Sequence, residues 1–169
     1  MPPRTRYTGN RAERGFTYIG ILLAVALIGI SLAAIGSTWS LQIKRAKEQD
    51  LIHVGQAYRR AIASYYRSGP AGVHQYPTSL SDLISDPRTP QLQRHIRQLY
   101  ADPMTGNADW RLVKTADGFI VGVASQSNQA PLKRANFDVW EAEFENAACI
   151  CDWEFVFLPQ LVHEESTQP

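Results

Sequence analysis

The chain has 169 residues and a formal net charge of +1 at neutral pH. That length fits one membrane span and one domain of roughly 100 residues with a single modest core. The small net charge hides an asymmetry: residues 1–66 carry nine Lys and Arg against three Asp and Glu, whereas residues 67–169 carry eight against thirteen. An acidic second part argues against nucleic-acid binding, which requires a basic face.

A long apolar run begins at Phe16, and residues 16–43 contain no Asp, Glu, Lys or Arg. Its densest part, residues 16–35, has about the 20 residues that a helix needs to cross a bilayer. A cleaved secretory signal has a shorter apolar centre, of about 7–15 residues, and a small-residue cleavage site. No Ala-x-Ala site follows this run. Periodicity alone leaves a plain one-pass anchor open.

The basic leader residues favour a cytoplasmic N-terminus: Arg4, Arg6, Arg11 and Arg14.

The front of the run reads Arg14-Gly15-Phe16-Thr17. A basic residue, then Gly, then Phe-Thr and a long apolar helix resembles the type IV prepilin signature. The resemblance implies that a prepilin peptidase on the cytoplasmic side cleaves between Gly15 and Phe16, and that the new N-terminal residue, Phe16, is N-methylated. A glycine just outside the bilayer suits such a cut, because it leaves an unhindered backbone.

The sequence departs from this family at Gly20. The family usually has Glu at the fifth mature position, where the carboxylate pairs with the N-terminal amine of a neighbouring subunit. An intramembrane carboxylate is costly and therefore needs such a reason. This chain cannot form that pair, so ordinary head-to-tail polymerisation is in doubt and a minor or tip-located subunit is expected.

The apolar pattern continues beyond the run as an amphipathic helix, with one face available for a core. Gly69-Pro70 predicts where this helix ends. The expected organisation is a leader over residues 1–15, excluded from the fold, a spine helix over 16–67 with 16–38 transmembrane, and a periplasmic α+β domain over 68–169. The apolar residues at helical spacing are Leu51, Val54, Tyr58, Ala61, Ile62 and Tyr65.

Residues 68–106 are rich in turn signals. We expect a short capped helix over 76–84 that starts at Thr78 or Ser79, a second short helix over 91–100, and a turn over 102–106. The order Tyr-Pro, Leu-x-x-Leu/Ile, Asp-Pro and Asp-Pro-x-x-Gly in this segment resembles the region after the spine in type II secretion pseudopilins.

An antiparallel sheet of about four strands is expected in the remaining chain. Asp117-Gly118 between apolar runs predicts a hairpin of strands 109–114 and 119–124. The alternation of apolar residues with Glu over 140–145 predicts a strand with one solvated face. A further strand over 149–158 completes a second hairpin that turns near Asn146-Ala147. The fold class is therefore α+β and pilin-like, with a long N-terminal helix packed on this sheet.

The candidate chemistry is sparse. Cys149 and Cys151 are the only thiols; on a strand they lie near the upper limit of bridging distance, so buried thiols are preferred over a disulfide. The four His show no metal-ligand spacing, and no Ser/His/Asp arrangement can be argued. Major pseudopilins bind calcium in a C-terminal loop, but residues 125–134 contain no carboxylate. Asp138, Glu141, Glu143 and Glu145 offer carboxylates for calcium, but alternating acids on a strand usually form its solvated face. No cofactor is therefore predicted, and calcium is the lesser alternative.

The resemblance implies a non-enzymatic, pseudopilin-like structural subunit of a type II secretion (general secretion pathway) or related pilus-type machine. Its partners are then other pseudopilin subunits, the prepilin peptidase, the inner-membrane secretion platform and the membrane itself. The expected location is the bacterial inner membrane, with a cytoplasmic N-terminus and a periplasmic C-terminal domain. The alternative is a single-pass anchored periplasmic enzyme or binding domain.

Overall fold

The computed structural model describes residues 13–159, and only the backbone of residues 13–16, 32–38 and 71. The described chain divides into two compact units between Ile43 and Lys44. The fold is α+β, and its elements in order are α1 (Glu13–Arg67), the 3-10 helices η1 (Pro70–Gly72) and η2 (Leu80–Leu83), β1 (Arg111–Lys114), β2 (Ile120–Ala124), η3 (Val139–Asn146), η4 (Ile150–Asp152) and β3 (Glu154–Val156).

Helix α1 has 55 residues and contains no proline. Its described part begins at Glu13, three residues before the predicted start. It ends at Arg67, as Gly69-Pro70 predicted, because proline lacks the N–H that a continuing helix needs. Residues 1–12 of the predicted leader lie outside the described residues.

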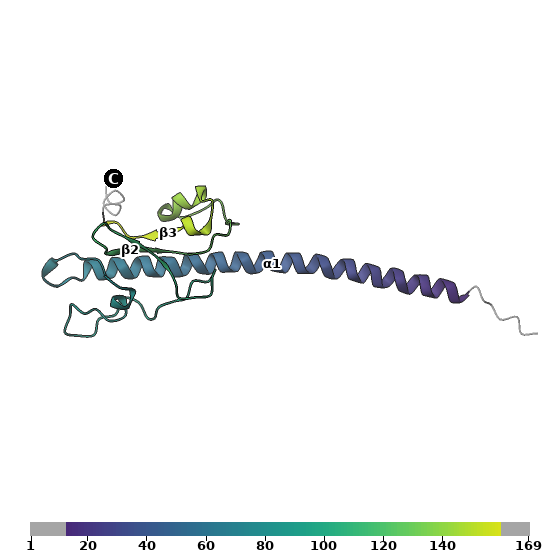
Figure 1. Cartoon of the computed structure of the whole chain (residues 1–169), viewed down its shortest axis with the longest axis horizontal. Helices are drawn as coiled ribbons and strands as arrows, with labels where there is room; N and C mark the ends of the chain where they lie inside the picture. The colour runs from purple at the N-terminus through teal and green to yellow at the C-terminus, as the bar shows by residue number, and fades with distance from the viewer. Residues whose placement is uncertain (1–12, 160–169) are drawn as a thin grey trace, which may run out of the picture. The chain divides into compact units, whose positions relative to one another are not determined.

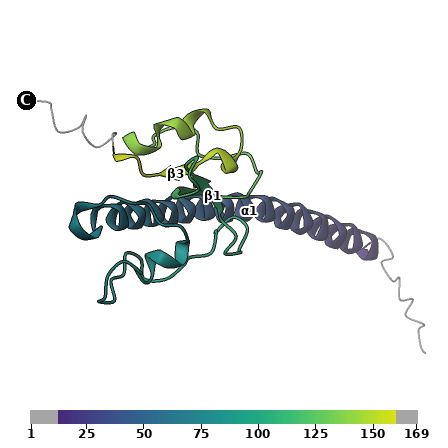
Figure 2. The same ribbon diagram turned by 60° about the vertical axis from the view of Figure 1, so that its left-hand side comes forward.

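The second part of α1 is the centre of the unit that starts at Lys44, which we call the body. Leu51, Tyr58 and Ile62 are fully buried, which confirms the predicted apolar face. Figures 1 and 2 show α1 between two layers: the sheet lies on one side, and the teal segment that follows α1 and contains η2 lies on the other. The core therefore forms around the helix on both sides.

The sheet has three antiparallel strands in the order β1-β2-β3, not the predicted four. The predicted hairpin joins β1 and β2, and Gly118 occupies its turn with a φ of 86°, a conformation that favours glycine. Every residue of β2 is buried, because β2 is the central strand. Helix α1 packs tightly on β3 at Gly55, where an added Cβ would overlap the Phe155 ring.

The predicted strand over 140–145 is wrong, since these residues lie in the 3-10 helix η3. Such a helix has three residues per turn, which places Glu141, Phe144 and Ala147 on one side. These three side chains are buried. The predicted strand over 149–158 is also shorter in the structure, where η4 precedes a β3 of three residues. The solvated strand face assigned to Glu141 is therefore incorrect.

The segment between α1 and the sheet agrees with the prediction in two places and differs in one. Helix η2 begins after Ser79, whose side chain and that of Asp82 form a capping box. The turn at Gly106 is also present, with a φ of 81°. The predicted helix over 91–100 is wrong: the chain instead wraps around η2, where the N–H groups of His95 and Ile96 both donate to the Leu83 carbonyl oxygen.

Candidate functional site

The predicted processing site lies in the first turns of α1. Gly15 and Phe16 both belong to the helix that begins at Glu13. The side chain of Phe16 lies outside the described residues, so the structure leaves the predicted cleavage and N-methylation as predictions. Gly20 is exposed, and a Cβ built on it would meet no atom within 4 Å. A larger residue, Glu included, is therefore sterically compatible with that position of the helix.

The segment of α1 from Thr17 to Ser31, which we call the apolar segment, exposes every side chain. Large apolar residues point in all directions around it and are 51–69% exposed: Tyr18, Ile19, Ile21, Leu22, Leu23, Val25, Leu27, Ile28 and Ile30. A helix that is apolar on every side is normally buried in protein or lipid.

The polar group at the end of the apolar segment is satisfied within the helix. The hydroxyl of Ser31 donates to the Leu27 carbonyl oxygen at 2.8 Å. Such a bond to the preceding turn lets serine lie in an apolar environment without an unpaired polar atom. Among the residues that the structure describes, no helix contains a stretch both long and apolar enough to cross a membrane.

Two buried carboxylates of the body link α1 to segments far away in the sequence. Glu48 is 2% exposed and accepts the N–H groups of Leu132 and Lys133 at 2.8 and 3.0 Å. Glu141 is 1% exposed and accepts from Gln56 at 2.8 Å and from Arg59 at 3.5 Å. A buried carboxylate requires such donors. The sequence pattern placed Glu141 on a solvated strand face, and the role of Glu48 was not predicted either.

The same contacts bear on the predicted calcium ligands. Glu141 Oε1 is already bonded to Gln56 and Arg59, and Asp138, Glu143 and Glu145 are at least partly exposed. Within the described part of the chain, these four carboxylates form no convergent group of three or more. The geometry therefore offers no positive support for a calcium site in η3.

A third buried carboxylate, Asp86, brings together residues from three segments. Arg88 donates to both of its oxygens, through Nε at 2.9 Å and Nη2 at 2.7 Å. These hydrogen bonds lower the pKa of Asp86 from 3.8 to about 2. The Nε2 atom of His95 lies 3.4 Å from Asp86, and its Nδ1 lies 2.8 Å from Ser64 Oγ.

Ser64, His95 and Asp86 thus form a hydroxyl–imidazole–carboxylate row that sequence reasoning could not find, because 22 and 9 residues separate its members. The row lacks two properties of a nucleophilic triad. The charge of Asp86 is already paired with Arg88, and Ser64 lies inside α1, where backbone N–H groups bond to the preceding turn instead of stabilising an oxyanion. The row holds the segment 86–95 against α1.

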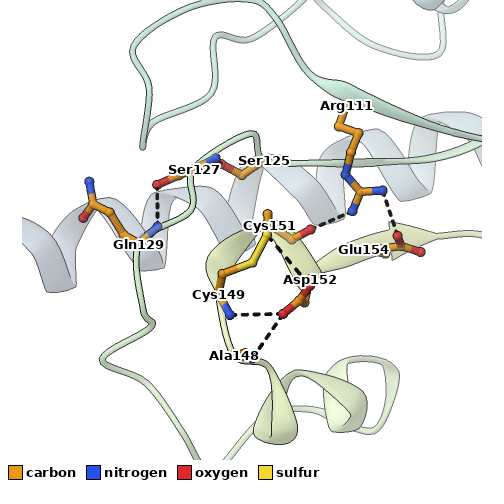
Figure 3. Close-up of a disulfide and its surroundings, with 9 residues drawn as sticks. All are labelled: Arg111, Ser125, Ser127, Gln129, Ala148, Cys149, Cys151, Asp152 and Glu154. Atoms are coloured by element: carbon orange, nitrogen blue, oxygen red, sulfur yellow. Dashed lines mark hydrogen bonds and ion pairs between the residues drawn. A yellow bond between two sulfur atoms is a disulfide. The ribbon is translucent and has the colours of Figure 1, made fainter.

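Cys149 and Cys151 form a disulfide, which corrects the prediction of two buried thiols. Their Cα atoms are 5.2 Å apart, shorter than the about 6.6 Å expected for alternate residues of a strand, because η4 curves the chain between them. Figure 3 shows the bridge on the η4 loop, with Asp152 beside it. The two sulfurs and a carboxylate oxygen of Asp152 lie within 4.8 Å of one another, but sulfurs bonded to each other are poor metal ligands.

No family model matches the chain, and no curated protein or solved structure matches it either.

Proposed function

We propose that the chain is a pseudopilin-like structural subunit of a type II secretion or related pilus-type filament machine. In this proposal the N-terminal part of α1 anchors the subunit in the bacterial inner membrane, and the body lies in the periplasm. The observation that carries the proposal is the apolar segment, exposed on every side, directly behind the Arg14-Gly15-Phe16 junction.

The exposed apolar segment needs a covering, because so much contiguous apolar surface is unfavourable in water. Lipid chains or neighbouring spine helices supply it in this proposal. The described side chains of this stretch stop at Ser31 and resume at Trp39. The uncharged sequence continues through residues 32–38, whose side chains lie outside the described residues, so the proposed span rests in part on sequence.

The disulfide supports a periplasmic location for the body. Disulfides persist in oxidising compartments, including the bacterial periplasm, and are rare in the cytosol. A bridge between Cys149 and Cys151 therefore suits a domain on the far side of the membrane from the basic leader. With Gly20 in place of the family's Glu, the subunit is a minor or atypical one.

The proposal is tested by the processing of the N-terminus. In cells that contain a prepilin peptidase, mass spectrometry of the mature protein should find Phe16, methylated, as its first residue. A bulky side chain in the Gly15→Leu variant should block cleavage, whereas Gly15→Ala, the matched control, should be processed nearly normally because the residue stays small. Wild-type processing of Gly15→Leu, or a mature chain that keeps its Met1, would refute the assignment.

A second candidate, a membrane-anchored periplasmic enzyme, has one observation in its favour: the Ser64–His95–Asp86 row. If Ser64 is a nucleophile, a serine-reactive fluorophosphonate should label the full chain, and Ser64→Ala should abolish the label. We expect no labelling, because the paired Asp86 leaves the imidazole without a free carboxylate partner.

A further inference from the structure

The loop over residues 147–153 carries the disulfide, and the bridge encloses a ring of only three residues. The stabilisation that a cross-link gives by restricting the unfolded chain grows with the logarithm of the loop length. It is therefore close to its minimum here. A bridge whose main purpose is to stabilise a domain usually joins distant segments, and this one joins nothing that the backbone does not already hold together.

The loop has its own supports, independent of the sulfur atoms. The carboxylate of Asp152 accepts the N–H groups of Ala148 and Cys149 at 3.1 and 3.0 Å, and Arg111 donates to the Cys151 carbonyl oxygen at 2.6 Å (Figure 3). The N–H of Ile150 donates to the Gln129 carbonyl oxygen, and the Ile150 side chain is fully buried.

No sulfur atom takes part in these contacts, so breaking the S–S bond removes none of them, and they can keep the two sulfurs near each other. A reduced pair held in this way reoxidises easily, because the reaction is intramolecular and the loop is preorganised. Opening and closing the bridge is therefore a local event that leaves the core around Trp153 and Phe155 in place, since both of these residues are fully buried on other contacts.

The bridge is also accessible. Cys149 and Cys151 are each only partly buried, and Ala148 and Asp152 beside them are exposed. The Sγ of Cys151 lies 3.8 Å from Asp152 Oδ1. A carboxylate disfavours negative charge most on the sulfur nearest to it, which favours Cys149 as the leaving group and Cys151 as the sulfur that an incoming thiolate attacks.

We propose that Cys149 and Cys151 form a thiol–disulfide exchange site whose substrate is a protein dithiol. One thiolate of the dithiol attacks Cys151 Sγ, the S–S bond breaks, and Cys149 leaves as a thiolate that takes up a proton. The second thiol of the dithiol then attacks the mixed disulfide and releases Cys151 as a thiol. Two electrons and two protons pass to this chain, and the dithiol is oxidised to a disulfide. This site is independent of the filament role proposed above.

The test uses the full chain in detergent micelles, with thioredoxin, its reductase and NADPH as the probe. Without denaturant, we expect consumption of one NADPH per chain and the appearance of two thiols in a maleimide gel-shift assay. The near-ultraviolet circular dichroism of the tryptophans should be unchanged after reduction, and air or oxidised glutathione should restore the bridge.

Two results would overturn the proposal. One is reduction only after the protein is denatured, which means that the bridge is inaccessible. The other is loss of the tryptophan signal on reduction, which means that the bridge is a structural element. The variant with both Cys149→Ser and Cys151→Ser separates the two readings: under the proposal it keeps the fold and consumes no NADPH, whereas under a structural role it fails to fold.

The direction of attack is tested separately. In Cys149→Ser the remaining thiol is Cys151, and in Cys151→Ser it is Cys149. With a disulfide reagent near neutral pH, we expect Cys149 to react several-fold faster than Cys151, because Asp152 disfavours the Cys151 thiolate. Equal rates, or a faster Cys151, would contradict the assignment of Cys149 as the leaving group.

Discussion

Two stretches of the same helix have opposite surfaces. In the apolar segment of α1, all side chains from Thr17 to Ser31 are exposed, although most of them are apolar. In the body part of α1, Leu51, Tyr58 and Ile62 are fully buried and polar residues lie between them. Backbone hydrogen bonding is the same in both, so the difference lies in the side-chain pattern: apolar on one face in the body part, apolar all round in the other. The chain's own core covers the apolar face of the body part, whereas the side chains of the apolar segment stay exposed.

The largest effect that this comparison predicts is at Ile62, which is 0% exposed. Truncation of a buried Ile to Ala removes contacts and leaves a cavity, at a cost of about 2–5 kcal/mol. The Ile62→Ala variant of the full chain should therefore lower the melting temperature of the body by about 10 °C or more. Arg60→Ala, an exposed residue of the same helix, is the matched control.

Arg59 is not a suitable control for that experiment. It binds the buried Glu141 and its guanidinium lies 5.5 Å from the centre of the Trp140 ring. Its loss would leave the Glu141 carboxylate with fewer donors. If Ile62→Ala and Arg60→Ala shifted the melting temperature equally, the assignment of the buried helical face would be wrong.

The glycines of α1 allow the comparison to be made with one substitution in each stretch. A Cβ on Gly55 would overlap the Phe155 ring, whereas a Cβ on Gly29 would meet nothing within 4 Å. Gly55→Ala should destabilise the body by about 1–3 kcal/mol through overpacking. Gly29→Ala should leave the melting temperature of the body unchanged. A Gly55→Ala variant that is more stable than wild type, through the better helix propensity of Ala, would show that α1 does not approach β3 so closely.

Acid unfolding probes the polar contacts of the body. Because the Arg88 hydrogen bonds lower the folded-state pKa of Asp86 to about 2, the unfolded state binds the proton more tightly. The resulting stability, about 2 kcal/mol, is fully present above about pH 4 and is lost as the pH falls from about 4 to about 2. Denaturant unfolding at a series of pH values should show this loss.

The matched variant is Asp86→Asn, which is less stable at neutral pH but has no proton to take up at this position. Its unfolding free energy should fall less steeply than that of wild type between about pH 4 and pH 2. Parallel curves for the two proteins would mean that Asp86 does not contribute to acid unfolding.

The sequence predicted features that depend on neighbouring residues. The buried face around Tyr58 follows from helical spacing, the end of α1 from Gly69-Pro70, and the β1–β2 turn from Asp117-Gly118. The strand predicted in the η3 region was wrong for a physical reason. In 140–145, Glu alternates with apolar residues as in a strand, but Glu141 and Phe144 are buried with the spacing of a 3-10 helix. The alternation alone does not distinguish the two structures.

The sites depend on contacts between distant residues, and local patterns cannot predict those. The pairing of Glu48 with Leu132 and the row from Ser64 to Asp86 result from packing of the segments onto α1. The disulfide depends on the curvature of the chain at η4, which no residue pattern predicted. The processing junction is the opposite case, since Gly15 and Phe16 are adjacent and a local motif suffices to propose it.

Substitution of Gly20 is expected to have the smallest effect on the fold. It therefore separates the role of α1 in assembly from its role in the core of the body. Its position is exposed and sterically open, so Gly20→Glu should leave the melting temperature of the body unchanged. After the proposed cleavage, the amine of Phe16 is largely charged at neutral pH, given a reference pKa of about 7.7–8. In a membrane bundle such a charge needs a carboxylate, and residues 16–43 contain none.

A neighbouring subunit with Glu at the fifth position can supply a carboxylate to this chain's amine, but this chain cannot do the same for the next subunit. Overexpressed alone, the wild-type protein should therefore form no long fibres, whereas Gly20→Glu should self-assemble. Shearing of the cells followed by electron microscopy measures both, and Gly20→Gln controls for side-chain size without charge. Abundant homopolymers of the wild-type chain would show that the amine needs no carboxylate partner. The absence of a glutamate would then say nothing about the position of the subunit in a filament.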